Sequence, residues 1–128
     1  MSEIPEDLRF AETHEWVRDD GDGKFTMGIT DHAQSEMGEI VMIELPSVGD
    51  QFDSGDVVGT LEAVKTAADF YAPLGGKVTE VNESLEDSPE KINQDPYGEG
   101  WLVSFESDDG EAVSGLMSAA EYRQHAGD

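Results

Sequence analysis

Short apolar runs separated by turn-forming residues set the pattern of this chain. None is longer than a single β-strand, and glycine, proline or aspartate follows most of them. The runs that predict strands cover residues 15–17, 24–30, 40–45, 57–64, 68–74, 77–81 and 101–105. A charged segment at residues 19–23 predicts the turn between the first two strands. The pattern therefore favours a compact, mainly β architecture.

A first short helix is predicted at residues 31–38. Asp31 is placed to cap its first amide groups, and Gln34 stands three positions further on, as in a capping box. Gly38 suits the end of the helix, because glycine readily takes the left-handed conformation that often follows a last turn.

A second capping box, Ser118 with Glu121, predicts a C-terminal helix over residues 119–124. Between the two helices, a helical turn is predicted at residues 88–92, where serine and proline begin the segment. Residues 93–100 contain proline and two glycines, so an ordered turn is expected there.

Lys65 lies between two predicted strands, residues 57–64 and 68–74. It is one of four lysines in a chain with 30 aspartates and glutamates. Gly55 and Gly76 mark the outer ends of the two strands, so the segment reads as a β-hairpin with the lysine at its tip. An amine offered to solvent in this way suits covalent attachment of a cofactor better than catalysis in place. Most exposed lysines are solvated charges, so the hairpin alone leaves both interpretations open.

Length and composition limit what else the chain can be. At 128 residues it can bury one hydrophobic core, and we expect a single domain over residues 1–128. No stretch approaches the ~20 apolar residues that cross a bilayer, and the N-terminus lacks the features of a signal peptide. With no cysteine there is no disulfide, thiolate metal site or thiol nucleophile. We therefore expect a cytoplasmic protein that acts as a monomer.

The chain is strongly acidic, with a formal net charge of −23. Such a charge repels nucleic acid and anionic membranes, which excludes both as partners. The acidic residues are spread along the chain and apolar clusters remain between them, so the chain should fold. The acidity is either incidental or an adaptation to a cytoplasm of high salt, where charge repulsion is screened. Scarce lysine together with abundant aspartate favours the second explanation.

Several motifs extend from the lysine hairpin over the rest of the chain. They are residues 13–17 (Thr-His-Glu-Trp-Val), 28–34 with 44–46, 62–76 around Lys65, and 93–102 (Asn-Gln-Asp-Pro-Tyr-Gly-Glu-Gly-Trp-Leu). In order and spacing they resemble the glycine cleavage system H protein, a lipoyl-carrier family, from about Phe10 to the C-terminal helix. The resemblance implies a barrel-sandwich hybrid: two small antiparallel sheets with quasi-twofold halves, and short helices including one at the C-terminus.

The resemblance also implies a carrier that is not itself an enzyme. Lipoic acid would be joined by an amide to Lys65, and the protein would shuttle the aminomethyl group of glycine. The implied partners are a pyridoxal-phosphate glycine decarboxylase, a tetrahydrofolate-dependent aminomethyltransferase and dihydrolipoyl dehydrogenase, together with a lipoate ligase or lipoyl-transfer enzymes. In such a system the cofactors supply the chemistry, and the carrier protein supplies presentation and protection.

Protection requires a cleft that keeps water from the loaded arm. The resemblance places Thr13, Glu15 and His32 in it, with Asp69 near the hairpin and Glu62 retained beside the lysine. A carboxylate and a hydroxyl are suitable acceptors for the ammonium group of the cargo. Taken one by one, these residues read equally well as ordinary surface or capping residues. The other histidines, at positions 14 and 125, look structural or incidental.

The match to the family departs at two positions beside the lysine. The family commonly has serine where Ala63 stands and alanine where Thr66 stands. Biotin carriers normally have methionine on both sides of the lysine, where this chain has Val64 and Thr66. Lipoyl domains of 2-oxoacid dehydrogenases are shorter and usually have aspartate before the lysine. A free-standing enzyme using Glu15 and His32 as an acid–base pair, a carrier in another pathway, and an unmodified interaction module remain as alternatives.

Overall fold

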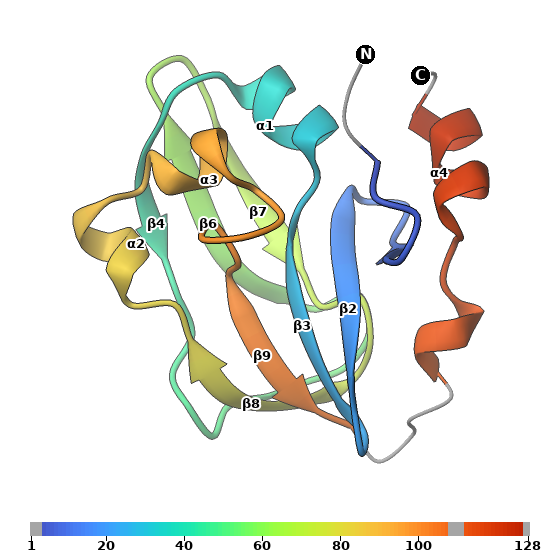
Figure 1. The fold of residues 1–128 in the computed structure, drawn as a ribbon. Coiled ribbons are helices and arrows are strands. Elements are labelled where there is room, and N and C mark those ends of the chain that lie inside the picture. Colours follow the sequence, from blue (N-terminus) through green and yellow to red (C-terminus); the bar gives the residue numbers. More distant parts are fainter. Residues whose placement is uncertain (1–3, 108–111, 127–128) are drawn as a thin grey trace.

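A computed structural model describes residues 4–107 and 112–126, which form two antiparallel sheets and short helices (Figure 1). Within this part, the larger sheet has the strand order β1-β2-β3-β9-β8-β5, and the smaller sheet has the order β4-β6-β7. The strands are β1 (Arg9–Phe10), β2 (Glu15–Gly21), β3 (Lys24–Ile29), β4 (Ile40–Glu44), β5 (Gln51–Phe52), β6 (Val57–Ala63), β7 (Ala67–Tyr71), β8 (Gly76–Val81) and β9 (Val103–Glu106). The helices are α1 (Asp31–Met37), α2 (Ser84–Asp87), α3 (Lys91–Gln94), the 3₁₀ helix η1 (Ala112–Gly115) and α4 (Ala119–Ala126). The predicted mainly β fold is confirmed.

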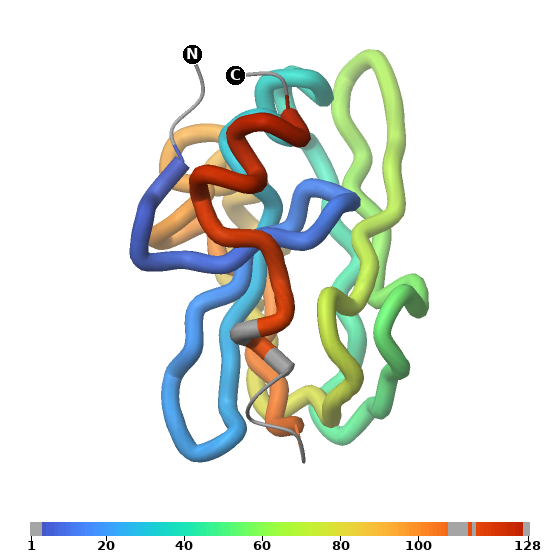
Figure 2. The backbone as a smooth tube through the Cα atoms, turned by 90° about the vertical axis from the view of Figure 1, so that its right-hand side faces the viewer, coloured from blue at the N-terminus to red at the C-terminus, as the bar shows by residue number. Residues whose placement is uncertain are grey.

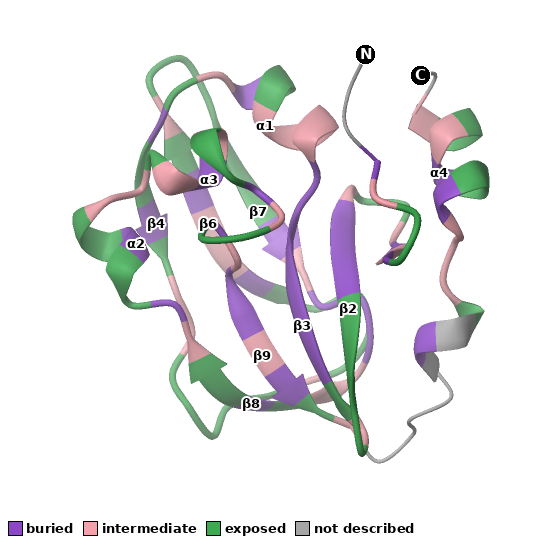
Figure 3. Ribbon diagram, viewed as in Figure 1, coloured by how far each residue is buried: buried purple, intermediate pink, exposed green. Residues whose placement is uncertain are grey.

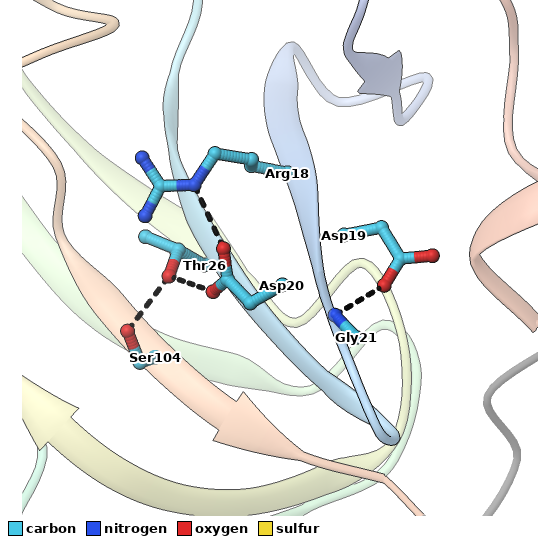
Figure 4. A network of polar contacts seen from close by, with 6 residues as sticks. All are labelled: Arg18, Asp19, Asp20, Gly21, Thr26 and Ser104. Atoms are coloured by element: carbon cyan, nitrogen blue, oxygen red, sulfur yellow. Dashed lines mark hydrogen bonds and ion pairs between the residues drawn. The ribbon is translucent and has the colours of Figure 1, made fainter.

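The end of β2 differs from the prediction. Asp19 and Asp20 belong to the strand instead of the turn, so β2 continues to Gly21. Figure 4 shows why Asp20 stays in the sheet: its carboxylate accepts the hydroxyl proton of the buried Thr26 at 2.6 Å and the Nε proton of Arg18 at 2.8 Å. A carboxylate that satisfies a buried hydroxyl stabilises the strand pairing, which a charge pattern alone does not reveal.

The main hydrophobic core joins the two sheets. Phe25 of β3 stacks on Phe105 of β9 with ring centroids 5.1 Å apart. Leu61 of β6 and Phe70 of β7 belong to the same buried cluster and come from the smaller sheet. Figure 3 shows the inner positions of these strands buried, while the tip of the β6–β7 hairpin is exposed. Alternation of buried and exposed positions therefore sets which face of each strand packs inward.

A second buried cluster attaches the C-terminal helix to the edge of the larger sheet. Trp16 lies at its centre, and its ring nitrogen donates to the carbonyl of Pro96 at 2.9 Å. Gly28 pairs with Trp16 across β2 and β3, and a Cβ atom there would lie 2.6 Å from the ring nitrogen. Glycine is therefore needed opposite this ring. Phe10 and Tyr122 belong to the same cluster and their rings stack on each other, so α4 lies beside β1 (Figure 2).

The predicted helices lie at nearly the predicted positions, but the cap of the first and the start of the second differ from the prediction. The cap of α1 is Thr30, whose hydroxyl accepts from the amide of Ala33 at 3.2 Å, and not Asp31 as predicted. α2 was not predicted, and α3 begins at Lys91, two residues after Pro89, the predicted first helical residue. The capping box of Ser118 with Glu121 is confirmed by bonds of 2.9 and 3.3 Å. No helix among the described residues is long and apolar enough to cross a membrane.

Candidate functional site

Lys65 occupies the tip of the β6–β7 hairpin, as predicted. The strands pair in register up to Glu62 and Ala67, and the amide of Ala63 closes the turn on the carbonyl of Thr66 at 2.7 Å. Backbone groups make this closure, so the departures from the family pattern at Ala63 and Thr66 leave the turn intact. The lysine is exposed, and Figures 1 and 2 both show the tip standing at one end of the molecule beside α1.

The lysine stem lies over the end of α1. Gly38 has a φ of +79°, and a Cβ atom built on it would meet Cε of Lys65 at 3.2 Å. Any L side chain here would be strained and would also push the lysine away. The amide of Val64 donates to the carbonyl of Glu39 at 3.0 Å, so the hairpin tip is bonded to the same segment. Gly38 therefore serves as a cradle for the lysine as well as the end of the helix.

Asn93 holds that cradle in place from α3. Its side-chain carbonyl accepts from the amide of Ile40 at 2.9 Å. Its side-chain amide donates to the carbonyl of Gly38 at 2.7 Å and to the side chain of Gln34 at 3.0 Å. From the same motif, the hydroxyl of Tyr97 accepts from the first amide of α1 at 2.9 Å. The segment at residues 93–102 thus supports α1, which explains why it accompanies a distant lysine hairpin.

A cavity of about 410 Å³ opens between α1, the start of β2 and strand β7. Its polar lining residues are Thr13, His14, Glu15, His32, Glu36 and Asp69. Its apolar lining includes Ile29, Met37, Leu61 and Phe70. The three residues that the resemblance assigned to a cleft therefore line one cavity together with Asp69, which it placed near the hairpin. Asp69 lies four residues beyond Lys65 along β7, so the cavity is adjacent to the lysine hairpin.

Glu15 is the most buried polar group of this cavity, with 1% of its surface exposed. Burial raises the pKa of its carboxyl to about 7, against the opposing effect of three hydrogen bonds. The Thr13 hydroxyl donates to Oε1, the amide of Tyr71 donates to Oε2 at 3.3 Å, and the backbone of Glu15 itself makes the third. Glu15 is therefore a carboxyl held ready for a cationic partner.

The outer residues of the site are less enclosed. Asp69 is exposed and accepts from the Thr60 hydroxyl at 3.0 Å, while it lines the mouth of the cavity. Glu62 is exposed, pairs with Met42 of β4 and does not line the cavity. His32 lies 3.6 Å from Glu36, one turn further along α1. Glu62 is thus near the lysine in the chain but is not one of the residues that line the cavity.

Two residues of the site lie in the family motifs but were not singled out from the sequence. His14 lines the cavity and stacks on His32 with centroids 4.8 Å apart, whereas it had looked incidental. Burial lowers its pKa, and the neighbouring His32 lowers it further. Asn93 holds the segment beneath the lysine through hydrogen bonds to residues more than 50 positions away in the sequence. Contacts of this range leave no periodic pattern in a single sequence.

A model of the glycine cleavage H-protein family matches residues 8–128. The chain belongs to this family. It is 57% identical over 122 residues to the glycine cleavage system H protein of Alteromonas mediterranea, covering 95% of each chain. It is 50% identical to that of Herpetosiphon aurantiacus over all of this chain and 97% of the other. The crystal structure of an H protein from Mycobacterium marinum matches with a TM-score of 0.88 at 36% identity, covering 98% of this chain and all of that one.

Glycine cleavage H proteins are the lipoyl carriers of their system. They bear the lipoyl group on a lysine and work with the P, T and L proteins, which are the decarboxylase, the aminomethyltransferase and the dihydrolipoyl dehydrogenase. The predicted family, carrier function and cofactor are therefore confirmed, as are the three partner proteins of the glycine cleavage system. A biotinyl carrier or an unmodified interaction module is not favoured. Which residues of this chain carry out the function is a separate question.

Proposed function

We propose that this chain carries lipoic acid on Lys65 and shelters the aminomethyl group of glycine in the cavity beside it, without catalysing a step itself. The observation that carries the proposal is the position of Lys65: exposed at a hairpin tip, over a glycine cradle, next to a cavity with a buried carboxyl. We take residues 1–128 as one carrier domain that works in the cytoplasm.

The residues around Lys65 fit a lipoyl amide. The lysine stem rests on Gly38, where no Cβ blocks it, and its amine is free of a carboxylate within the described residues. Loss of the ammonium charge on amide formation therefore breaks no ion pair described here. When bound, the lipoyl group would supply a disulfide that is reduced as it takes up the one-carbon unit and is left as a dithiol when the unit is released.

The cavity residues hold the ammonium group of the cargo. The Glu15 carboxylate accepts a charge-assisted hydrogen bond from it, and the Thr13 hydroxyl keeps that carboxylate oriented. Asp69 adds a second carboxylate at the mouth. The apolar walls formed by Met37 and Phe70 limit the access of water. His32 serves as a further acceptor while its ring is neutral.

Glu62 has a different part in this proposal. It is exposed, lies three residues before the lysine and does not line the cavity. A carboxylate in this position is available to the lipoate ligase or lipoyl-transfer enzyme when it binds the hairpin. Glu62 therefore belongs to recognition of the lysine and not to protection of the cargo.

Modification of the protein purified from its native host tests the attachment. Intact mass and peptide mapping should find one lipoyl group, on Lys65. The Lys65→Arg variant should fold normally but lose lipoylation and all glycine cleavage in a reconstituted system. Lys77→Arg, an exposed lysine of β8, is the matched control and should leave both unchanged. Glycine cleavage that persists in the Lys65→Arg variant would refute the assignment.

A further inference from the structure

The cavity is tied to the C-terminal helix by one buried hydroxyl. We propose that Tyr122 of α4 is a positioning residue of the sheltering cavity, since its hydroxyl fixes the His14 ring and the start of α1. The proposal rests on the sheltering function proposed for the cavity. It extends the site to a helix that does not line it.

The evidence is a chain of hydrogen bonds. The Tyr122 hydroxyl lies 2.7 Å from Nδ1 of His14 and 2.8 Å from the hydroxyl of Thr30. Thr30 in turn caps α1 by accepting from the amide of Ala33 at 3.2 Å. In the proposed arrangement the Thr30 hydroxyl donates to Tyr122 and the Tyr122 hydroxyl donates to Nδ1, so that His14 is the neutral tautomer protonated at Nε2. One hydroxyl thus connects the β1–β2 turn to the N-terminus of α1.

Packing holds that hydroxyl in a single place. The Tyr122 side chain is fully buried, and its ring stacks on Phe10 with centroids 4.7 Å apart and an interplanar angle of 12°. The amide of Phe10 also donates to the carbonyl of Met117, just before α4. Removal of the hydroxyl alone would leave this apolar packing in place, so its effect can be measured without loss of the helix.

His14 needs such an anchor. Its φ of 70° is in the left-handed region, which a residue with a side chain seldom adopts. Its amide donates to the carbonyl of Ala11 at 3.1 Å, and its carbonyl accepts from Thr30 at 3.0 Å. Thr13 and Glu15 are its chain neighbours, so a shift of His14 would move both acceptors of the cargo. Strained residues often mark functional sites, and this one separates the two acceptors.

The charged neighbours of His14 make its orientation matter. His32 and Glu36 face it from α1, His125 faces it from α4, and Glu15 follows it in the chain. No group of His, Asp and Glu side chains within residues 4–107 and 112–126 is arranged to hold a metal ion, so the stacked rings are not a metal site. A neutral ring next to the cavity avoids repulsion of the cationic cargo. The hydrogen bond to Nδ1 favours this neutral form.

Tyr122→Phe tests the proposal in two ways. In the unlipoylated protein, nitrogen chemical shifts of the His14 ring should show Nδ1 unprotonated in the wild type, and the variant should lose this preference and have a higher His14 pKa. In the loaded carrier, water releases formaldehyde and ammonium and restores the thiol. This release should be roughly threefold to tenfold faster in the variant, as expected for the loss of one neutral hydrogen bond.

Ser104→Ala is the matched control, because it removes a hydroxyl that lies 2.8 Å from the Thr26 hydroxyl, on a residue that does not line the sheltering cavity. It should change neither measurement. If Tyr122→Phe does not fold, Thr30→Val breaks the same chain of bonds and Thr30→Ser retains it, so the two variants should differ in the same readouts. An unchanged His14 tautomer and release rate in Tyr122→Phe, or no difference between the Thr30 variants, would overturn the proposal.

The rate of formaldehyde release from the wild-type carrier distinguishes a failure of the Tyr122 proposal from a failure of the proposed sheltering function. A wild-type carrier that releases formaldehyde as fast as a free lipoyl peptide would show that the cavity does not shelter the cargo. In that case the proposed sheltering function is wrong. A shift of the His14 tautomer in Tyr122→Phe would then show only that Tyr122 orients the His14 ring. A protected wild type with an unprotected Tyr122→Phe variant supports both.

Discussion

At the scale of single residues, Glu15 and His14 show how burial prepares the site. Burial disfavours the charged form of each side chain, so it raises the pKa of Glu15 to about 7 and lowers that of His14. Near neutral pH, His14 is therefore mostly neutral and Glu15 is partly protonated. A cationic cargo reverses the balance for Glu15, because the ammonium group favours its carboxylate.

Glu15→Gln should change how stability depends on pH. The folded pKa of about 7 lies above the ordinary value of 4.5, so the folded wild type holds this proton more tightly than the unfolded chain. The free energy of unfolding therefore falls as pH rises from about 4.5 to about 7, by up to about 3 kcal/mol. Glutamine does not titrate and avoids this loss.

Denaturant unfolding at pH 4 and pH 8 measures the effect. The stability of Glu15→Gln relative to the wild type should increase between the two pH values, and the loaded variant should release its cargo faster. Glu62→Gln, which changes an exposed carboxyl, is the control for general charge effects. Parallel pH profiles for Glu15→Gln and the wild type would contradict the assigned burial of this carboxyl.

At the scale of elements, the lysine hairpin is held by α1 and α3 as much as by its own pairing. β6 and β7 fix the register of the turn, and the amide of Val64 attaches the tip to the segment after α1. α3 then fixes that segment through the three bonds of Asn93. The position of Lys65 thus depends on contacts among elements that are distant in sequence.

Asn93→Leu should loosen this support. It leaves the amide of Ile40 and the carbonyl of Gly38 without their side-chain partner, which should cost about 2 kcal/mol of stability. The rate of lipoylation by a lipoate ligase should fall, because the cradle beneath Lys65 is no longer fixed. Thermal unfolding and a lipoylation time course measure the two effects. Gln94→Leu, its exposed neighbour on α3, should be close to wild type; equal losses in both variants would contradict the role of Asn93.

At the scale of the whole molecule, a net charge of −23 on 128 residues opposes compaction. Ions screen repulsion between exposed charges within about 10 Å at ~0.1 M salt and within about 3 Å at ~1 M. The fold joins two sheets through one apolar core, so this repulsion acts against the burial that holds the sheets together. We propose that the protein is adapted to a cytoplasm of high salt.

Potassium chloride should therefore raise the melting temperature steeply, by several degrees between low and molar concentrations. Sucrose at equal osmolality is the control, because it promotes compaction without screening charge. A melting temperature that does not change with potassium chloride, or that rises equally in sucrose, would remove the case for salt adaptation.

The sequence by itself determined the features that depend on neighbouring residues. The mainly β fold, the hairpin with Lys65 at its tip and the C-terminal capping box follow from local periodicity and turn chemistry, which act over a few positions. The family motifs added Thr13, Glu15, His32 and Asp69 as candidates. They could not show that these four share one cavity, because that depends on how the sheets pack.

Only the tertiary structure decided the contacts that close over long separations. Tyr122 reaches His14 across 108 positions, and Asn93 reaches Ile40 across 53. The end of β2 at residues 19–21 pairs with β3, and Thr30, which caps α1, also bonds Tyr122 across 92 positions. Hydrogen bonds of this kind form only where packing brings two distant side chains together. The hydrophobic periodicity of a single sequence reports local structure and does not indicate which distant residues meet.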